Sequence, residues 1–269
     1  MRQSQHHQAI PMTPYAFRKH VRSGLFTSHT TGQCEGFVQA NVAILPKAYA
    51  EDFQRFCEAN TKPYPLIARL PAGVYTLPKE IANAGDIRRD VPQYCVLRDG
   101  NVVETISDIT PYWTDELVTF LIGCSFTFEL ALMEAGIRLP HVEQGKNVAI
   151  YESNIPCQSV GPFHSNMVVS MRPINQTRVH DAIDITSHYP TMHGAPVHVG
   201  DPKQIGITDL SQVTFGDAVT INPEEVPVFW ACGVTPQRAL MNAKMPFAII
   251  HAPGHMLITD IPHQHFYAR

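Results

Sequence analysis

The chain contains the stretch Cys124-Ser125-Phe126-Thr127-Phe128-Glu129-Leu130-Ala131-Leu132 and, later, Cys232-Gly233-Val234-Thr235-Pro236-Gln237-Arg238-Ala239-Leu240. Both stretches read Cys-x-x-Thr-x-x-x-Ala-Leu. Each follows a short apolar run typical of a buried strand, at 118–122 and at 226–231, and each opens a segment with helical composition. The sequence therefore predicts the same strand-turn-helix unit twice.

A turn of this kind has a direct consequence for ligand binding. The first backbone N–H groups of a helix have no partner within it, and the helix dipole adds positive potential at the same point. Anionic ligands bind at such turns in open α/β sheets. We expect the turns at Cys124-Ser125 and at Gly233 to Thr235 to lie around one pocket. Thr127 and Thr235 are predicted to cap the two helices, with Pro236 at the first helical position.

The composition favours a globular protein that acts on a small molecule. The chain has 269 residues, of which 44% are hydrophobic and 16% charged, enough for a substantial core. A net charge of −4 with scattered Lys and Arg offers no basic field for a nucleic acid or an anionic membrane. The six cysteines are widely spaced without a Cys-x-x-Cys pair, which favours a reducing, cytoplasmic setting. Assembly into a homo-oligomer is left open.

Helices and strands alternate along the chain, which predicts an α/β protein. Strands are expected at 37–45 and 66–70, a helix at 47–59, and a hairpin from 94–97 and 102–106 around an Asp-Gly turn. Between the two repeats, the sequence predicts short strands, a short helix at 176–185 and proline-rich links. We therefore expect a smaller α+β domain over 141–200, inserted into a larger domain formed by 1–140 and 201–269.

Several side chains are candidates for chemistry. A thiolate at Cys124 or Cys232 would be stabilised by the adjoining helix start, although a buried cysteine is more often a small hydrophobic residue. Ser125 and Thr235 are expected as cap or ligand-binding hydroxyls rather than nucleophiles. Arg172, which follows a strand-like run, suits a bidentate contact with a carboxylate.

Histidines and one acid are the candidate proton carriers. His164 and His198 lie in Gly/Pro-rich loops of the kind that hold functional groups, and Glu143 lies in a polar turn. His251 and His255 have the spacing of helical metal ligands, but Pro253-Gly254 between them forbids a helix. A metal is therefore not expected. No cofactor is expected either, since the absence of Rossmann, Walker and kinase motifs gives no indication of nucleotide chemistry.

Taken together, a set of short phrases resembles the D-glutamate cyclase family, over about residues 18 to 260. The chain departs from the family pattern at Cys34-Glu35, Pro140 and Ala149. The phrases that carry the resemblance are Gln39-Ala40-Asn41, Gly123-Cys124-Ser125-Phe126, His141-Val142-Glu143, Val168-Val169-Ser170-Met171-Arg172-Pro173, His193-Gly194-Ala195-Pro196-Val197-His198, Phe229-Trp230-Ala231-Cys232-Gly233-Val234-Thr235-Pro236-Gln237 and His251-Ala252-Pro253-Gly254-His255-Met256.

The resemblance implies a cytosolic protein with a larger three-layer α/β/α domain and a smaller two-layer α+β domain. It also implies a lyase that removes water, interconverting D-glutamate and 5-oxo-D-proline or acting on a related small carboxylic acid.

For this reaction we expect Arg172 to anchor the substrate carboxylate, with Ser125, Gly233, Thr235 and His198 as further binding residues. His164 or Glu143 would carry protons, and Cys124 is retained as a catalytic candidate. The alternatives are an olefin-forming hydro-lyase, a non-catalytic protein that binds a small carboxylate, and a metal-dependent hydrolase using His198, His251 or His255.

Overall fold

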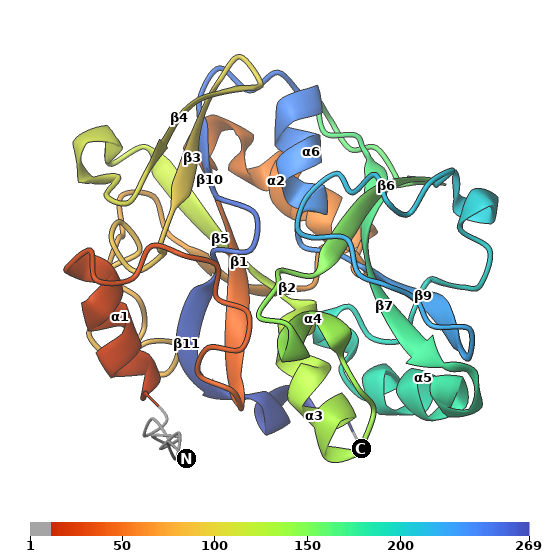
Figure 1. The fold of residues 1–269 in the computed structure, drawn as a ribbon. Coiled ribbons are helices and arrows are strands. Elements are labelled where there is room, and N and C mark those ends of the chain that lie inside the picture. The colour runs from red at the N-terminus through yellow and green to blue at the C-terminus, as the bar shows by residue number, and fades with distance from the viewer. Residues whose placement is uncertain (1–11, 269) are drawn as a thin grey trace.

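The computed structural model describes residues 12–268, which form two β-sheets with helices around them (Figure 1). The first sheet has seven strands in the order β2-β5-β1-β10-β3-β4, and β11 pairs with β1 as well. Every recorded pairing in this sheet is antiparallel. Its strands are β1 (Phe37–Pro46), β2 (Leu66–Leu70), β3 (Tyr94–Arg98), β4 (Asn101–Ile106), β5 (Leu117–Gly123), β10 (Ala248–His251) and β11 (Leu257–Pro262).

The second sheet has four strands in the order β6-β7-β9-β8, again all antiparallel. It uses β9, which lies beyond residue 200, so this sheet extends past the segment 141–200 expected for a smaller domain. The division of the chain into two domains stays a prediction. The strands are β6 (Ala149–Pro156), β7 (Asn166–Asn175), β8 (His198–Val199) and β9 (Glu225–Ala231).

The helices are short, and α2 with 13 residues is the longest one described. Within residues 12–268, no helix combines the length and the apolar character that crossing a bilayer requires. The α-helices are α1 (Pro14–Arg22), α2 (Lys47–Ala59), α3 (Glu129–Glu134), α4 (Pro140–Glu143), α5 (Val179–Ser187) and α6 (Thr235–Asn242). Single turns of 3-10 helix are η1 (Thr110–Tyr112), η2 (Ser125–Phe128), η3 (Gln176–Arg178), η4 (Pro190–Met192), η5 (Pro202–Ile205) and η6 (His263–Phe266).

β1 is buried on both faces and organises the core. Its residues alternate between two hydrophobic clusters, as the period of a strand requires. Ala43 and Leu45 pack with α2 and α6, whereas Val42 and Ile44 belong to a cluster that includes Trp230 of the second sheet. The second sheet is therefore packed against the first through a shared core. The mixed α/β class is confirmed, and the three-layer arrangement of the larger part stays a prediction.

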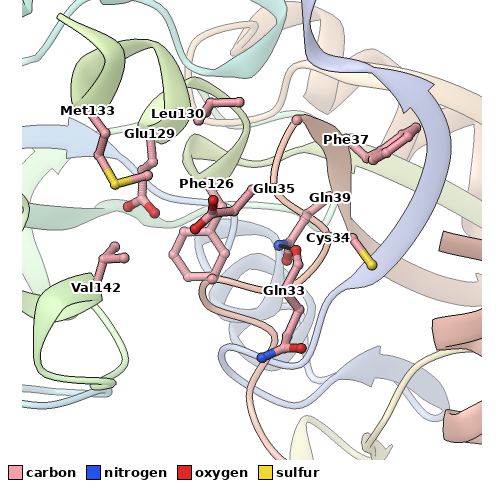
Figure 2. Close-up of a pocket in the computed structure, with 12 residues that line it drawn as sticks. Gln33, Cys34, Glu35, Phe37, Gln39, Phe126, Glu129, Leu130, Met133 and Val142 are labelled. Carbon is pink, nitrogen blue, oxygen red and sulfur yellow. Dashed lines mark hydrogen bonds between the residues drawn. The ribbon is translucent and has the colours of Figure 1, made fainter. Parts of the chain in front are cut away.

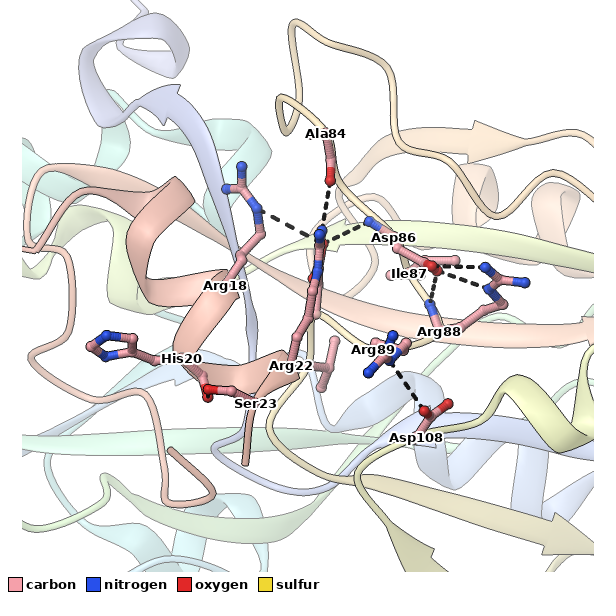
Figure 3. Close-up of polar contacts among 12 residues, drawn as sticks. Arg18, His20, Arg22, Ser23, Ala84, Asp86, Ile87, Arg88, Arg89 and Asp108 are labelled. Atoms are coloured by element: carbon pink, nitrogen blue, oxygen red, sulfur yellow. Dashed lines mark hydrogen bonds and ion pairs between the residues drawn. The ribbon is translucent and has the colours of Figure 1, made fainter. Parts of the chain in front are cut away.

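Residues 32–37 lead into β1 and lie beside α3 (Figure 2). Ion pairs hold α1 in place. Arg18, fully buried, donates to the Ile258 carbonyl at 3.0 Å and to the Asp260 carboxylate at 2.9 Å. Arg22, which lies beside Arg18 in Figure 3, pairs with the buried Asp90. These contacts fix the N-terminal helix against β11.

Candidate active site

The ends of two strands, β5 and β10, lie together because of how both pair with β1. β5 and β10 both run antiparallel to β1, so they run in the same direction and end at the same side of the sheet. Asn41 of β1 lies opposite Ile122, one residue before the end of β5, and Ala43 lies opposite Ile250, one residue before the end of β10. The turn after β5 and the end of β10 therefore lie together, although the sheet is not parallel.

A cavity lies where these ends face the second sheet, and both repeated turns line it. Its volume is about 20 Å³, which is room for roughly one water molecule. Ser125 and Cys124 come from the first turn, and Cys232 and Val234 from the second. The other lining residues are Asn41, Phe126, Asn147, Val148, Ile150, His251, Gly254 and Met256.

Each turn presents backbone amides that lack an oxygen partner in the described part of the chain. Among the described residues, no oxygen accepts a hydrogen bond from the N–H groups of Ser125, Phe126, Gly233 or Val234. The N–H of Phe126 points at the Cys124 thiol and that of Val234 at the Cys232 thiol, as expected for equivalent turns. The two turns thus offer donors to a ligand oxygen in the cavity.

The two thiols are protonated at neutral pH. Burial raises the pKa of Cys232 to about 11, against the lowering effect of the Val234 amide. Burial raises the pKa of Cys124 still further. The interpretation of these cysteines as small buried groups is therefore favoured over the thiolate interpretation.

The threonines of the repeat do not cap the helices, contrary to expectation. α6 begins at Thr235 itself, with Val234 as its N-cap, so Pro236 is the second helical residue. The Thr235 hydroxyl donates to the Cys232 carbonyl at 2.6 Å and accepts from the Val168 N–H at 3.1 Å, which joins the turn to β7. Thr127 lies inside η2, and its buried hydroxyl has no partner among the described residues.

Arg172 is fully buried beneath the first turn, in a network with Glu129 and His141. Its Nε and Nη2 donate to Oε1 of Glu129 at 2.9 and 2.5 Å, and Nη1 donates to the Ser170 hydroxyl at 3.1 Å. His141 Nε2 lies 2.9 Å from the same Oε1. Burial raises the pKa of Glu129, but the charges of His141 and Arg172 outweigh it and hold the pKa below its usual range.

Arg172 reaches the cavity through Ser125. Its Nη2 donates to Ser125 Oγ at 3.1 Å. A hydroxyl that accepts from a guanidinium keeps its own hydrogen for another acceptor. Ser125 lines the cavity, so this hydrogen is available to a ligand oxygen there.

The expected proton carriers and His198 lie outside the cavity lining. Glu143 is exposed on α4 and pairs with Arg138 at 2.6 Å, as a solvated acid does. His164 is exposed, and its Nδ1 lies 3.1 Å from the Pro162 carbonyl. His198 stands on β8, with Nε2 2.8 Å from the Asp201 carbonyl. Each of these three side chains therefore contacts a residue close to it in sequence.

His251 is an imidazole that lines the cavity, and the sequence analysis considered it only as a metal ligand. Gln237 Nε2 donates to the His251 carbonyl at 2.9 Å and lies 3.3 Å from Nε2 of the ring. On the other side of the ring, the Val42 N–H donates to Nδ1 at 3.1 Å, and the Val42 carbonyl oxygen lies 3.2 Å from the same nitrogen. Burial lowers the pKa of His251 to about 4, so the ring is neutral.

Asn41 and Asn147 were also missed, although the sequence carries a signal for Asn41. Gln39 and Asn41 are polar residues two apart in an otherwise apolar strand, so they share one face of it. Gln39 and Asn41 are both buried, and Asn41 Nδ2 donates to the Gly123 carbonyl at 2.6 Å. Within residues 12–268, no cluster of three or more His, Cys, Asp or Glu side chains is arranged to hold a metal ion.

Comparisons with known proteins identify the family. The model of the D-glutamate cyclase family matches residues 118–260, which span both repeated turns. A protein of Burkholderia multivorans named "Putative hydro-lyase" is 53% identical over 251 residues, covering 93% of this chain and 96% of its own. Proteins of the same name from Corynebacterium urealyticum and Natranaerobius thermophilus are 52% and 50% identical, covering 93% and 90% of this chain and 94% and 93% of their own. The family and these names support a lyase. The chain belongs to the D-glutamate cyclase family.

Proposed function

We propose that this hydro-lyase interconverts D-glutamate with 5-oxo-D-proline and water, in the cavity between the two repeated turns. The observation that supports this site most strongly is the pair of equivalent turns that line one cavity, each with backbone N–H groups that lack an oxygen partner among the described residues. A dicarboxylic amino acid needs donors for two carboxyl groups, and two equivalent turns offer them. The unpaired cysteines suit a reducing compartment, so we propose a cytoplasmic location.

Ring closure joins the neutral amine to the γ-carboxyl carbon, and water then leaves the tetrahedral centre. The amides of one turn would hold the α-carboxylate, and those of the other would stabilise the oxyanion that forms. Ser125, polarised by Arg172, would add a donor, so Arg172 acts through it rather than as a direct anchor. Orientation within the cavity supplies part of the acceleration because the attack is intramolecular.

His251 is our candidate for accepting the ammonium proton, in place of His164 and Glu143. Among the lining residues it offers the one imidazole, and none of them carries a carboxylate. Its ring is neutral at neutral pH, so it has one ring nitrogen without a hydrogen, as a proton acceptor must.

Substrate binding requires the cavity walls to separate. A volume of about 20 Å³ is far too small for an amino acid, and the walls come from both sheets. We expect the second sheet to move away from Asn41 and His251 for entry and to close over bound substrate, which would exclude water from the amides.

The test is to incubate the purified protein with D-glutamate, and separately with 5-oxo-D-proline, and to follow both by chiral chromatography. Conversion of the D-forms is expected, with the L-forms as matched controls. Ser125→Ala and His251→Asn should lower kcat/KM by at least tenfold, whereas His164→Asn and Glu143→Gln should leave it within twofold. Saturable binding without conversion would instead indicate a binding protein, and loss of water to give an olefin from a hydroxy acid would indicate the rival hydro-lyase reaction.

A further inference from the structure

A second cavity of about 20 Å³ shares Phe126 with the first, and Figure 2 shows its lining residues. Residues 32–37, which lead into β1, form one wall, and side chains of α3 form the other. Phe126 lines both cavities, but the remaining lining residues differ between them. The second cavity is therefore a separate site, and the proposed reaction makes no use of it.

Glu129 carries a free carboxylate oxygen in this second cavity. The residue is only 4% exposed, and all three of its hydrogen bonds, with His141 and Arg172, fall on Oε1. Oε2 accepts no hydrogen bond from any described residue, and Glu129 lines the cavity. Because neighbouring charges keep the group ionised, Oε2 is a strong acceptor without a donor.

The rest of the lining selects the kind of donor. No Lys, Arg or His lines this cavity, and a second carboxylate, Glu35, is exposed on residues 32–37. Leu130, Met133 and Val142 make the opposite wall apolar. An apolar wall beside an acceptor suits a group with several N–H donors on an alkyl carbon.

The size of the cavity and the charges around it further limit which donor group can bind Glu129. A volume near 20 Å³ admits a group about as large as water, such as –NH₃⁺, with any longer chain directed outward past Glu35. Arg172 offsets the charge of Glu129 at long range, so the attraction acts through a direct hydrogen bond. A quaternary ammonium has no N–H to donate and is too large for the cavity.

We infer that this second cavity is a binding site for the primary ammonium group of a small amine, held by Oε2 of Glu129. The site is distinct from the cavity between the repeated turns, and binding there does not depend on turnover of D-glutamate.

The inference is tested by titrating the full-length protein with methylammonium chloride in a calorimeter, with tetramethylammonium chloride and methanol as matched probes. Saturable binding of methylammonium is expected, at least tenfold tighter than that of either probe. Absence of saturable methylammonium binding, or equal affinity for all three, would overturn the proposal. Because no D-glutamate is present, failure of the proposed reaction leaves this result unaffected.

Two variants locate the site. Glu129→Gln should weaken methylammonium binding at least tenfold, whereas Glu35→Gln, which changes only the exposed carboxylate, should weaken it less than threefold. Glu129→Gln removes the partner of buried Arg172, so Leu130→Trp, which fills the cavity and keeps the ion pair, provides a second test and should also abolish binding. Unchanged methylammonium binding in Leu130→Trp would show that the ammonium group does not bind in this cavity.

Discussion

Asn41 lies against Gly233 and so joins the two repeated turns. A Cβ atom at Gly233 would stand 1.8 Å from Nδ2 of Asn41, a distance that no real side chain tolerates. The same Nδ2 donates to the Gly123 carbonyl at 2.6 Å, at the start of the first turn. Asn41 therefore packs on one turn while it binds the other, and glycine at 233 is a requirement of that contact.

Gly233→Ala should displace the Asn41 amide and break its hydrogen bond to Gly123. We expect kcat/KM to fall at least tenfold, because the turns lose their relative position, and stability to fall by about 1–3 kcal/mol, as for other overpacked buried sites. Steady-state kinetics and urea unfolding measure the two effects.

The double variant Asn41→Ala/Gly233→Ala is the control for this prediction. It removes the clashing amide, so its stability should be higher than the sum of the two single changes predicts. If the losses of unfolding free energy in the two single variants simply added up in the double variant, a methyl group at position 233 would not clash with the Asn41 amide.

Local pattern was enough to predict most elements. The strands at 118–122 and 226–231, the hairpin at 94–106 and the helix at 47–59 are all present, because alternation, turn residues and helical spacing are properties of neighbouring residues. The repeated Cys-x-x-Thr phrase also located the turns that line the first cavity.

What the sequence could not show depends on contacts between distant residues. Arg172 and Glu129 are 43 residues apart, and His251 and Val42 are 209 apart, so no local pattern reports their hydrogen bonds. The strand directions in the sheets are set by the same long-range pairing. The threonine caps were wrong because the Thr235 hydroxyl has a better partner on β7, which is distant in sequence.

The Arg172–Glu129 pair should matter more for stability than any surface ion pair. Arg172→Met would leave Glu129 buried without its cation, which costs about 3–5 kcal/mol in comparable cases. Urea unfolding should show this loss, whereas Arg138→Gln, which breaks the exposed pair with Glu143, should change little. The double variant Arg172→Met/Glu129→Gln removes both charges and should recover part of the loss. If Arg138→Gln were as destabilising as Arg172→Met, burial would not explain why the Arg172–Glu129 pair matters for stability.

Acid should destabilise the protein from pH 6.5 downward. Burial lowers the pKa of both His193 and His251 from 6.5 to about 4, so below pH 6.5 the unfolded chain binds protons that the folded chain does not. Stability is then complete above pH 6.5 and is lost as the pH falls towards 4, by up to about 3 kcal/mol for each ring.

Unfolding free energies at pH 7.5, 6.0 and 5.0 test this pH dependence. His193 has φ 75°, a conformation that asparagine tolerates, and its Nδ1 donates to the Lys62 carbonyl. His193→Asn keeps a donor but cannot titrate, so its stability should fall less steeply with pH than that of the parent. Identical slopes for the two proteins would contradict the contribution of His193.

The thiols of the repeated phrase should be slow to react and dispensable for turnover. Burial holds Cys232 at a pKa of about 11 and Cys124 higher, so almost no thiolate exists at pH 7.5. Mass spectrometry after iodoacetamide treatment should find both sites unmodified in the folded protein and modified after unfolding in urea. Cys124→Ala and Cys232→Ala should keep at least a tenth of the parent kcat, since the backbone amides of the turns remain. A loss of about a thousandfold in either variant, with folding intact, would instead assign that sulfur a direct part in the chemistry.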